Sequence, residues 1–216
     1  ESMHIITKLA VADSSDNPHQ QFRLSLQRLQ RNSIYGLLVH NADHLADNPD
    51  GDHIWSKLLE LKHNGYIRKL GVSVYEPEAL GNIIQSYDID LVQYPCNIFD
   101  QRFLEPQLQH DMQSRDIEQH IRSLFLQGLL LQDVSSLPER FNQNRQYFID
   151  FFRWRDHNKL SPMQAITAFA LWINDYGAVP ARYVIGIATP EQLDEICARA
   201  YVVNNNKDDS IHLDFS

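Results

Sequence analysis

Polar side chains that can bind a ligand or carry a proton close each of six short apolar runs along the chain. In chain order they are the ammonium of Lys8, the imidazole of His40, the hydroxyl of Ser73, the carboxamide of Gln93, the guanidinium of Arg122 beside the hydroxyl of Ser123, and Thr189, which starts a helix. If the runs are parallel strands, their carboxyl ends meet at one rim, where several side chains can act on one ligand. For any one of these residues alone, the favoured explanation is that it marks the point where a buried strand meets solvent. The six together favour a shared site.

The runs themselves have the character of parallel strands. They are short and apolar at consecutive positions, as expected for strands covered on both faces. They cover Ile5–Leu9, Tyr35–His40, Ile67–Val74, Leu91–Tyr94, Ile117–Ser123 and Tyr183–Ala188. Amphipathic helical patterns follow the first three runs, at 22–29, 54–62 and 77–86. This alternation predicts βαβ units in an α/β fold, and six strands fit an incomplete (β/α) barrel better than a doubly wound sheet.

Two later helix starts are clearly marked, and one stretch breaks the alternation. Ser161-Pro162-Met163-Gln164 and Thr189-Pro190-Glu191-Gln192 each combine an N-cap, a proline at the first helical position and a capping-box glutamine. The stretch 129–160 is interpreted as an insertion with an extra helix. Its aromatic segment Tyr147–Trp154 is expected to pack on the core or cover it, with a substrate-pocket wall and a dimer contact as alternatives.

Composition limits the classes of partner. Of 216 residues, 43% are apolar and 22% are charged, which is typical of a globular protein, and the formal net charge is −9. This balance argues against a general nucleic-acid binder or a binder of anionic membranes. The two cysteines cannot build a disulfide framework, so a cytoplasmic location is expected. No apolar run has the length of a membrane span.

Other reactive side chains are assigned structural roles. His40 and His44 have a spacing of four residues, but no glutamate or cysteine completes a zinc motif, so no metal is expected. Cys96 is interpreted as a buried small apolar residue rather than a nucleophile. Tyr75 and Tyr94 lie in strand motifs and are expected to be packing residues.

Six segments in collinear order resemble motifs of the aldo-keto reductase family. They are Ile5–Lys8, Leu37–His40, Gly65–Ser73, Val92–Asn97, Arg122–Leu130 and Gly186–Glu195. The most specific is Gly-Tyr-Ile-Arg-Lys-Leu-Gly-Val-Ser at 65–73, together with its spacing from the lysine and histidine motifs. The resemblance implies a (β/α)8 TIM barrel that reduces aldehydes or ketones with NADPH or NADH, with sugars, sugar derivatives or small aldehydes as candidate substrates.

The resemblance also assigns the catalytic residues. Lys8 matches the lysine and His40 the histidine of the family's Asp-Tyr-Lys-His set. A carbonyl that accepts hydride develops negative charge on its oxygen, so the site must offer a proton and oriented donors. An ammonium lowers the pKa of a neighbouring proton-donating tyrosine, and a histidine can orient or polarise the carbonyl.

Cofactor contacts are carried over in the same way. The matching positions are Ser73, Gln93, Arg122, Ser123, Gln127, Gly128, Gly186, Thr189, Gln192 and Glu195. Three residues depart from the family pattern: Val74 replaces an asparagine, Arg122 a tyrosine, and Ile196 an asparagine. The last junction carries no basic side chain for a 2′-phosphate, so NADP and NAD both remain candidates.

The family's catalytic aspartate and tyrosine have no match in residues 1–7. We therefore expect residues 1–216 to form a single N-terminally truncated barrel domain, with about six of eight strands and the insertion near 129–160. The expected partner is a small carbonyl substrate, without nucleic acid or membrane, and the expected state is a monomer or weak homo-oligomer. The alternative function is that of a non-catalytic barrel, a cofactor-binding regulatory or structural subunit.

Overall fold

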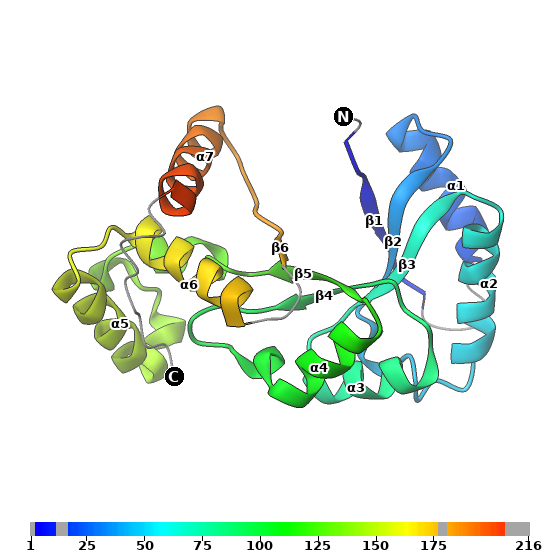
Figure 1. Cartoon of the computed structure of the whole chain (residues 1–216), viewed down its shortest axis with the longest axis horizontal. Helices are drawn as coiled ribbons and strands as arrows, with labels where there is room; N and C mark the ends of the chain where they lie inside the picture. The colour runs from blue at the N-terminus through cyan, green and yellow to red at the C-terminus, as the bar shows by residue number, and fades with distance from the viewer. Residues whose placement is uncertain (1–2, 12–16, 177–180, 206–216) are drawn as a thin grey trace. The chain divides into compact units, whose positions relative to one another are not determined.

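Strands and helices alternate along the chain in the computed structural model, which describes residues 3–11, 17–176 and 181–205 (Figure 1). The described strands form one sheet in the order β1-β2-β3-β4-β5-β6, and the pairs β1–β2, β2–β3 and β3–β4 are parallel. The strands are β1 (Ile6–Leu9), β2 (Ile34–His40), β3 (Ile67–Ser73), β4 (Leu91–Pro95), β5 (Glu118–Arg122) and β6 (Arg182–Tyr183). Spatial order that follows chain order is that of a (β/α) barrel, here with six strands rather than eight. The predicted fold class is confirmed.

Helices connect these strands and cover the sheet. The α-helices are α1 (Pro18–Leu29), α2 (Gly51–His63), α3 (Pro77–Ser86), α4 (Pro106–Ser114), α5 (Arg145–His157), α6 (Pro162–Tyr176) and α7 (Pro190–Asn205). Short 3₁₀ turns lie at η1 (Ala42–His44), η2 (Arg102–Leu104), η3 (Leu126–Leu131), η4 (Val134–Ser136) and η5 (Glu139–Asn144). The stretch 129–160 thus contains the predicted extra helix, α5, preceded by irregular turns.

Two local expectations need correction. The sixth strand was expected over Tyr183–Ala188 but covers only Arg182–Tyr183. Val184 N still donates to Ile121 O at 2.8 Å, and beyond it the residues from Gly186 to Thr189 are exposed, so burial no longer supports an extended ladder. Helix α4 was not expected from the pattern; the Glu105 carboxylate caps it by accepting from Leu108 N at 2.8 Å.

Local capping follows the sequence closely at α6. Ser161 Oγ accepts from Gln164 N at 3.2 Å, while Ser161 N donates to Gln164 Oε1 at 2.8 Å. This reciprocal pair is the predicted capping box, and it satisfies two backbone donors that a helix start leaves without intrahelical partners.

The chain divides into two compact units, which are described separately. The first comprises Glu1–Pro95 with Arg102–His120, and the second comprises Cys96–Gln101 with Ile121–Ser216. In the first unit, Leu37, Leu70 and Ile83 are fully buried between β2, β3 and the covering helices. In the second unit, the aromatic helix α5 buries three phenylalanines, Phe148, Phe151 and Phe152, which confirms the packing interpretation; Tyr147 is 65% exposed. Each such burial stabilises the fold by about 1.5–3 kcal/mol.

A buried ionic cluster links three strands of the first unit. The Glu118 carboxylate on β5 accepts from Tyr35 Oη on β2 and from Lys69 Nζ on β3, each at 2.6 Å. Its other oxygen lies 2.6 Å from His120 Nε2. Burial raises the pKa of Glu118, but hydrogen bonds from Lys69, Tyr35 and His120 outweigh it and lower that pKa to about 2. Because β4 lies between β3 and β5, the cluster ties together strands that are not sheet neighbours.

Gly71 allows β3 and β4 to approach closely just before a candidate site residue. A Cβ at this position would run into the Leu91 carbonyl oxygen and would lie 3.0 Å from Leu91 Cγ. Gly71 is two residues before Ser73 on the same strand, so the close approach also sets the placement of that hydroxyl.

We expect Gly71→Ala to lower the free energy of unfolding by about 1–3 kcal/mol, because backbone has to move to make room for the methyl group. The matched control is Gly81→Ala on α3, where no atom lies within 4 Å of the new Cβ. That control should stabilise by about 0.4–1 kcal/mol through the unfolded state. Urea denaturation of both variants measures the difference; equal effects would refute the close-approach argument.

Glu118→Gln should lower the free energy of unfolding at neutral pH by about 1–3 kcal/mol, as for hydrogen bonds to charged groups. The folded pKa of about 2 lies below the ordinary value of 4.5, so the carboxylate stabilises fully above 4.5 and progressively less as pH falls toward 2. The wild-type chain should therefore lose more stability across that interval than the variant.

Urea midpoints measured on both sides of that pH interval provide the readout. Glu60→Gln is the control, because Glu60 forms an exposed pair with Lys57 and its loss should change little. Parallel acid slopes for the wild-type chain and Glu118→Gln would show that the cluster does not contribute in this way.

Candidate active site

The sheet register places four of the predicted site residues on one face of the first unit. Ser73 is paired with His40 on β2 and with Gln93 on β4. Lys8 is paired with Leu38, which is two residues before His40 and therefore points to the same face. Lys8, His40, Ser73 and Gln93 thus share a face near the carboxyl ends of four consecutive strands.

Three of these side chains are in direct contact. Lys8 Nζ donates to Gln93 Oε1 at 2.6 Å and to Ser73 Oγ at 3.1 Å. Ser73 is 0% and Gln93 6% exposed, whereas Lys8 itself is only partly buried. Hydrogen bonds to a charged group are stronger than those between neutral groups, so these two partners hold the ammonium well. The hydroxyl and the carboxamide therefore fix the head group of Lys8.

His40 occupies the rim beside this contact. It is the last residue of β2 and is exposed, while its strand neighbours Leu38 and Val39 are buried. An imidazole at this place can donate to or accept from a molecule that enters from solvent. Lys8 and His40 thus lie on the same face of neighbouring strands, with the imidazole accessible to solvent.

The other predicted cofactor-binding residues belong to the second unit. The segment after β5 is conformationally strained: φ is 65° at Ser123, 47° at Leu126 and 55° at Gln127, followed by 84° at Gly128. Left-handed backbone at three non-glycine residues is costly and is characteristic of functional loops. The carbonyl of Arg122, the last residue of β5, accepts from Cys96 N at 3.0 Å.

The start of α7 carries the remaining four predicted residues. Gly186, Thr189, Gln192 and Glu195 are all exposed. Thr189 Oγ1 accepts from Gln192 N at 3.4 Å, whereas Gln192 Oε1 accepts from Ala188 N at 2.8 Å. The predicted cap is therefore present, with the glutamine reaching one residue further back than expected. Glu191 lies in the first turn of α7. Hydrogen bonds from the backbone N–H of Glu191 and from the Thr189 side chain lower the pKa of its carboxyl group.

Two of the three structural assignments are confirmed and one is wrong. Cys96 is fully buried, and burial, together with the charge of Asp100, raises the pKa of its thiol to about 12. Tyr94 is buried, stacks on Phe103 and donates to Gln119 Oε1 at 2.6 Å. Tyr75, expected to pack, is 42% exposed, because it follows the end of β3. Across the described ranges, no three histidine, cysteine or acidic side chains gather as a metal site.

The Glu118 cluster had no signal in the sequence. Its members are spread from position 35 to position 120, and neither spacing nor composition marks them as a group. Only the strand order and register bring Tyr35, Lys69 and Glu118 together.

Within the part of the chain that the structure describes, no helix combines the length and the apolar character that crossing a bilayer needs.

Known proteins are similar to this chain in sequence and in fold. The profile of the Aldo/keto reductase family matches residues 1–210. An aldo-keto reductase of Mycobacterium sp. (strain MCS) is 36% identical over 90 residues, which cover 39% of this chain and 29% of that protein. The chain thus spans about a third of this relative and about two thirds of the similar solved structures.

Two of those structures show the fold. The holo form of an aldo-keto reductase from Bacillus halodurans has a TM-score of 0.69 at 20% identity, covering 92% of this chain and 66% of that one. A mutant protein solved in complex with NADPH has a TM-score of 0.63 at 18% identity, covering 91% and 64%. The family match along nearly the whole length, with the shared strand order, leads to one conclusion: this chain belongs to the aldo/keto reductase family.

Proposed function

We propose that the protein is an oxidoreductase that transfers hydride from NADPH or NADH to the carbonyl carbon of an aldehyde or ketone. The observation that carries the proposal is the convergence of Lys8, Ser73 and Gln93 from three strands, beside His40. A site at the carboxyl ends of the strands is where this type of barrel performs its chemistry. Sugars, sugar derivatives or small aldehydes are the proposed substrates.

Ser73 and Gln93 suit a nicotinamide carboxamide. That group has a carbonyl acceptor and an NH2 donor, and a hydroxyl and a side-chain amide each offer both functions. Lys8 engages their acceptor oxygens, while the Ser73 hydroxyl hydrogen and the Gln93 NH2 are donors suited to a carbonyl oxygen. When bound, the reduced nicotinamide supplies the hydride, and the chain supplies its orientation.

Lys8 and His40 then act on the substrate oxygen. Hydride addition to a carbonyl carbon leaves negative charge on that oxygen, and donors held in place stabilise it without reorganising. The alcohol then forms by transfer of a proton to that oxygen, a role that the resemblance gives to a tyrosine with no match in residues 1–7. The Lys8 ammonium is held at 2.6 Å from Gln93, so its charge is fixed before substrate arrives. His40 orients the carbonyl from the solvent side of the same face.

The start of α7 favours NADH over NADPH. The segment 183–192 after β6 carries no lysine or arginine, and the Glu191 carboxylate lies at the helix start, where a phosphate would otherwise bind. A similar solved structure is nevertheless a complex with NADPH, so both cofactors are included in the test.

A second candidate function is a cofactor-binding subunit without catalysis. Val74, where the resemblance expects asparagine, is 0% exposed, and its backbone N donates to Gln93 O at 3.0 Å. Its side chain offers no polar contact to a carboxamide. Binding of the cofactor with no turnover of any carbonyl would favour this function.

Fluorescence titration with NADH and with NADPH tests the cofactor site. We expect saturable binding, and Gln93→Leu should weaken it roughly tenfold, because a buried amide partner is lost. Gln113→Leu on the exposed end of α4 is the control and should bind like the wild-type chain. Absence of binding for both nucleotides would contradict both candidate functions.

Steady-state carbonyl reduction tests the catalytic roles. The assay uses the chain joined to a segment that supplies the family's aspartate and tyrosine, because residues 1–7 match neither. In that protein, Lys8→Met and His40→Ala should each lower kcat by about 10²–10⁴-fold, as expected for loss of a positioned donor. The controls are Lys57→Met and His44→Ala, which remove exposed side chains of the same types outside the contact. Wild-type turnover in Lys8→Met and His40→Ala would refute their assignment.

A further inference from the structure

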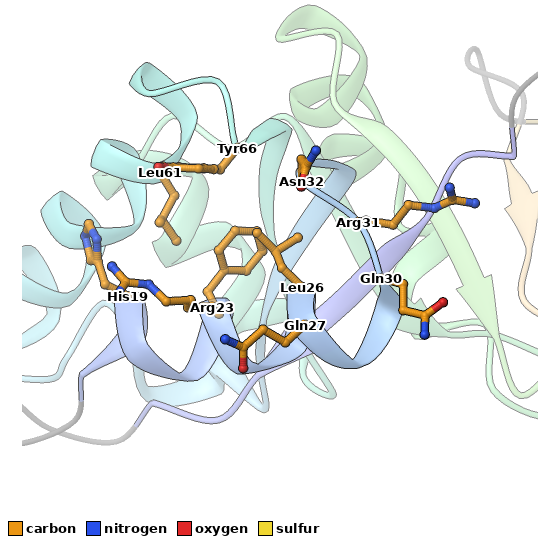
Figure 2. A pocket seen from close by; sticks show the side chains of 10 residues that line it. His19, Arg23, Leu26, Gln27, Gln30, Arg31, Asn32, Leu61 and Tyr66 are labelled. Carbon is orange, nitrogen blue, oxygen red and sulfur yellow. The ribbon is translucent and has the colours of Figure 1, made fainter.

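A groove in the first unit lies between α1 and α2, apart from the candidate active site. It has a volume of about 590 Å³ and is lined by His19, Phe22, Arg23, Leu26, Gln27, Gln30, Arg31, Asn32, Leu61 and Tyr66 (Figure 2). This volume is within the range of small-molecule sites, roughly 300–1,000 Å³. Both walls come from helices that pack against each other, so the groove is formed by one unit alone.

The groove opens at the amino ends of the strands. Gln30, Arg31 and Asn32 lie just before β2, and Tyr66 lies just before β3. Lys8, Ser73 and Gln93 lie toward the carboxyl ends of their strands. A molecule in the groove is therefore neither the proposed substrate nor the nicotinamide of the proposed cofactor.

The lining combines an apolar floor with a polar rim. Phe22, Leu26 and Leu61 are at most 9% exposed and form the floor. Above them lie the side-chain amides of Gln27 and Gln30 and the half-exposed ring of Tyr66, at 45%. Figure 2 shows Arg23 beside His19 at one end and Arg31 beside Asn32 at the other. Such a lining suits a molecule with a flat apolar body and polar ends.

The charge of this segment is opposite to that of the whole chain. Residues 17–40 contain three arginines and no aspartate or glutamate, although the net charge is −9. His19 is already engaged, 3.2 Å from Glu60 Oε2 and 2.9 Å from Lys57 O. Among the described residues, no ion pair involves Arg23 or Arg31. Among the residues that the structure describes, no carboxylate therefore pairs with these two guanidinium groups of the lining.

We propose that this groove is a second ligand site, for a small aromatic anion. The aromatic body packs on Phe22, Leu26 and Leu61, and the carboxylate or phosphate binds Arg23 or Arg31. Arginine suits both anions, because its planar fork matches their oxygens bidentately. The groove lies at the amino ends of the strands, whereas Lys8 lies toward the carboxyl end of its strand, so occupancy does not require the proposed reaction.

The probes are 2-naphthoate, 1-naphthyl phosphate and the uncharged 2-naphthamide, each titrated against the full chain by isothermal calorimetry. We expect both anions to bind and the amide to bind at least roughly fivefold more weakly, since one charge-assisted contact is lost. Stronger binding of the phosphate or of the carboxylate distinguishes the two ligand classes.

Arg23→Gln, Arg31→Gln and the double variant locate the site. At least one single variant should weaken 2-naphthoate roughly threefold to tenfold, and the double variant should do so more. Arg28→Gln is the matched control: it removes the same charge from the same helix but lies outside the lining. Lys8→Met excludes the active site as the place of binding and should leave naphthoate affinity unchanged.

Three results would overturn the proposal: no binding of either anion, equal weakening in Arg28→Gln and the groove variants, or loss of binding in Lys8→Met alone. The four arginine variants change exposed side chains, and only Lys8→Met does not. Circular dichroism verifies that each of the five variants is folded as the wild-type chain.

Discussion

The placement of one ammonium depends on the register of four strands. Lys8 is only partly buried, and its ammonium is held on this face of the sheet because the buried side chains of Ser73 and Gln93 supply acceptor oxygens at hydrogen-bond distance. A shift of one residue in β1, β3 or β4 would turn Lys8, Ser73 or Gln93, respectively, to the opposite face. The site is thus a consequence of register, and register in turn depends on the apolar residues that cover both faces of β2 and β3.

Two further features hold that register. Gly71 permits β3 to lie against the Leu91 carbonyl, two residues before Ser73. The Glu118 cluster joins β5 to β2 and β3 in the other half of the strands, through contacts of 2.6 Å. The first acts by sterics and the second by charge, so they respond differently to substitution and to pH. Together they stabilise the strand register on which the position of the Lys8 head group depends.

How far the sequence predicts this molecule differs between its parts. The apolar runs at 35–40, 67–74 and 91–94 predicted strands that the structure places at 34–40, 67–73 and 91–95, because strands buried on both faces leave a clear pattern. The capping box at Ser161 was equally clear, since it depends on neighbours three residues apart. The site residues Lys8, Ser73 and Gln93 were found from their positions at strand ends, and the resemblance added their roles.

Long-range and marginal features were not predictable in the same way. The two-residue strand β6 had the apolar pattern of a longer one, but the residues from Arg182 to Ile185 are exposed or only partly buried. Helix α4 has a weak apolar stripe and depends on the Glu105 cap. The Glu118 cluster and the groove beside α1 arise from residues far apart in the chain, and only the folded arrangement brings them together.

The central claim is that the Lys8 ammonium, fixed by Ser73 and Gln93, faces the nicotinamide cofactor. NMR of the chain with ¹⁵Nζ-labelled lysine tests it most directly, with the Lys8 signal assigned by its loss in Lys8→Met. The account predicts that saturating NADH or NADPH shifts this signal more than that of exposed Lys57. Bound cofactor that leaves the Lys8 resonance unmoved would contradict it.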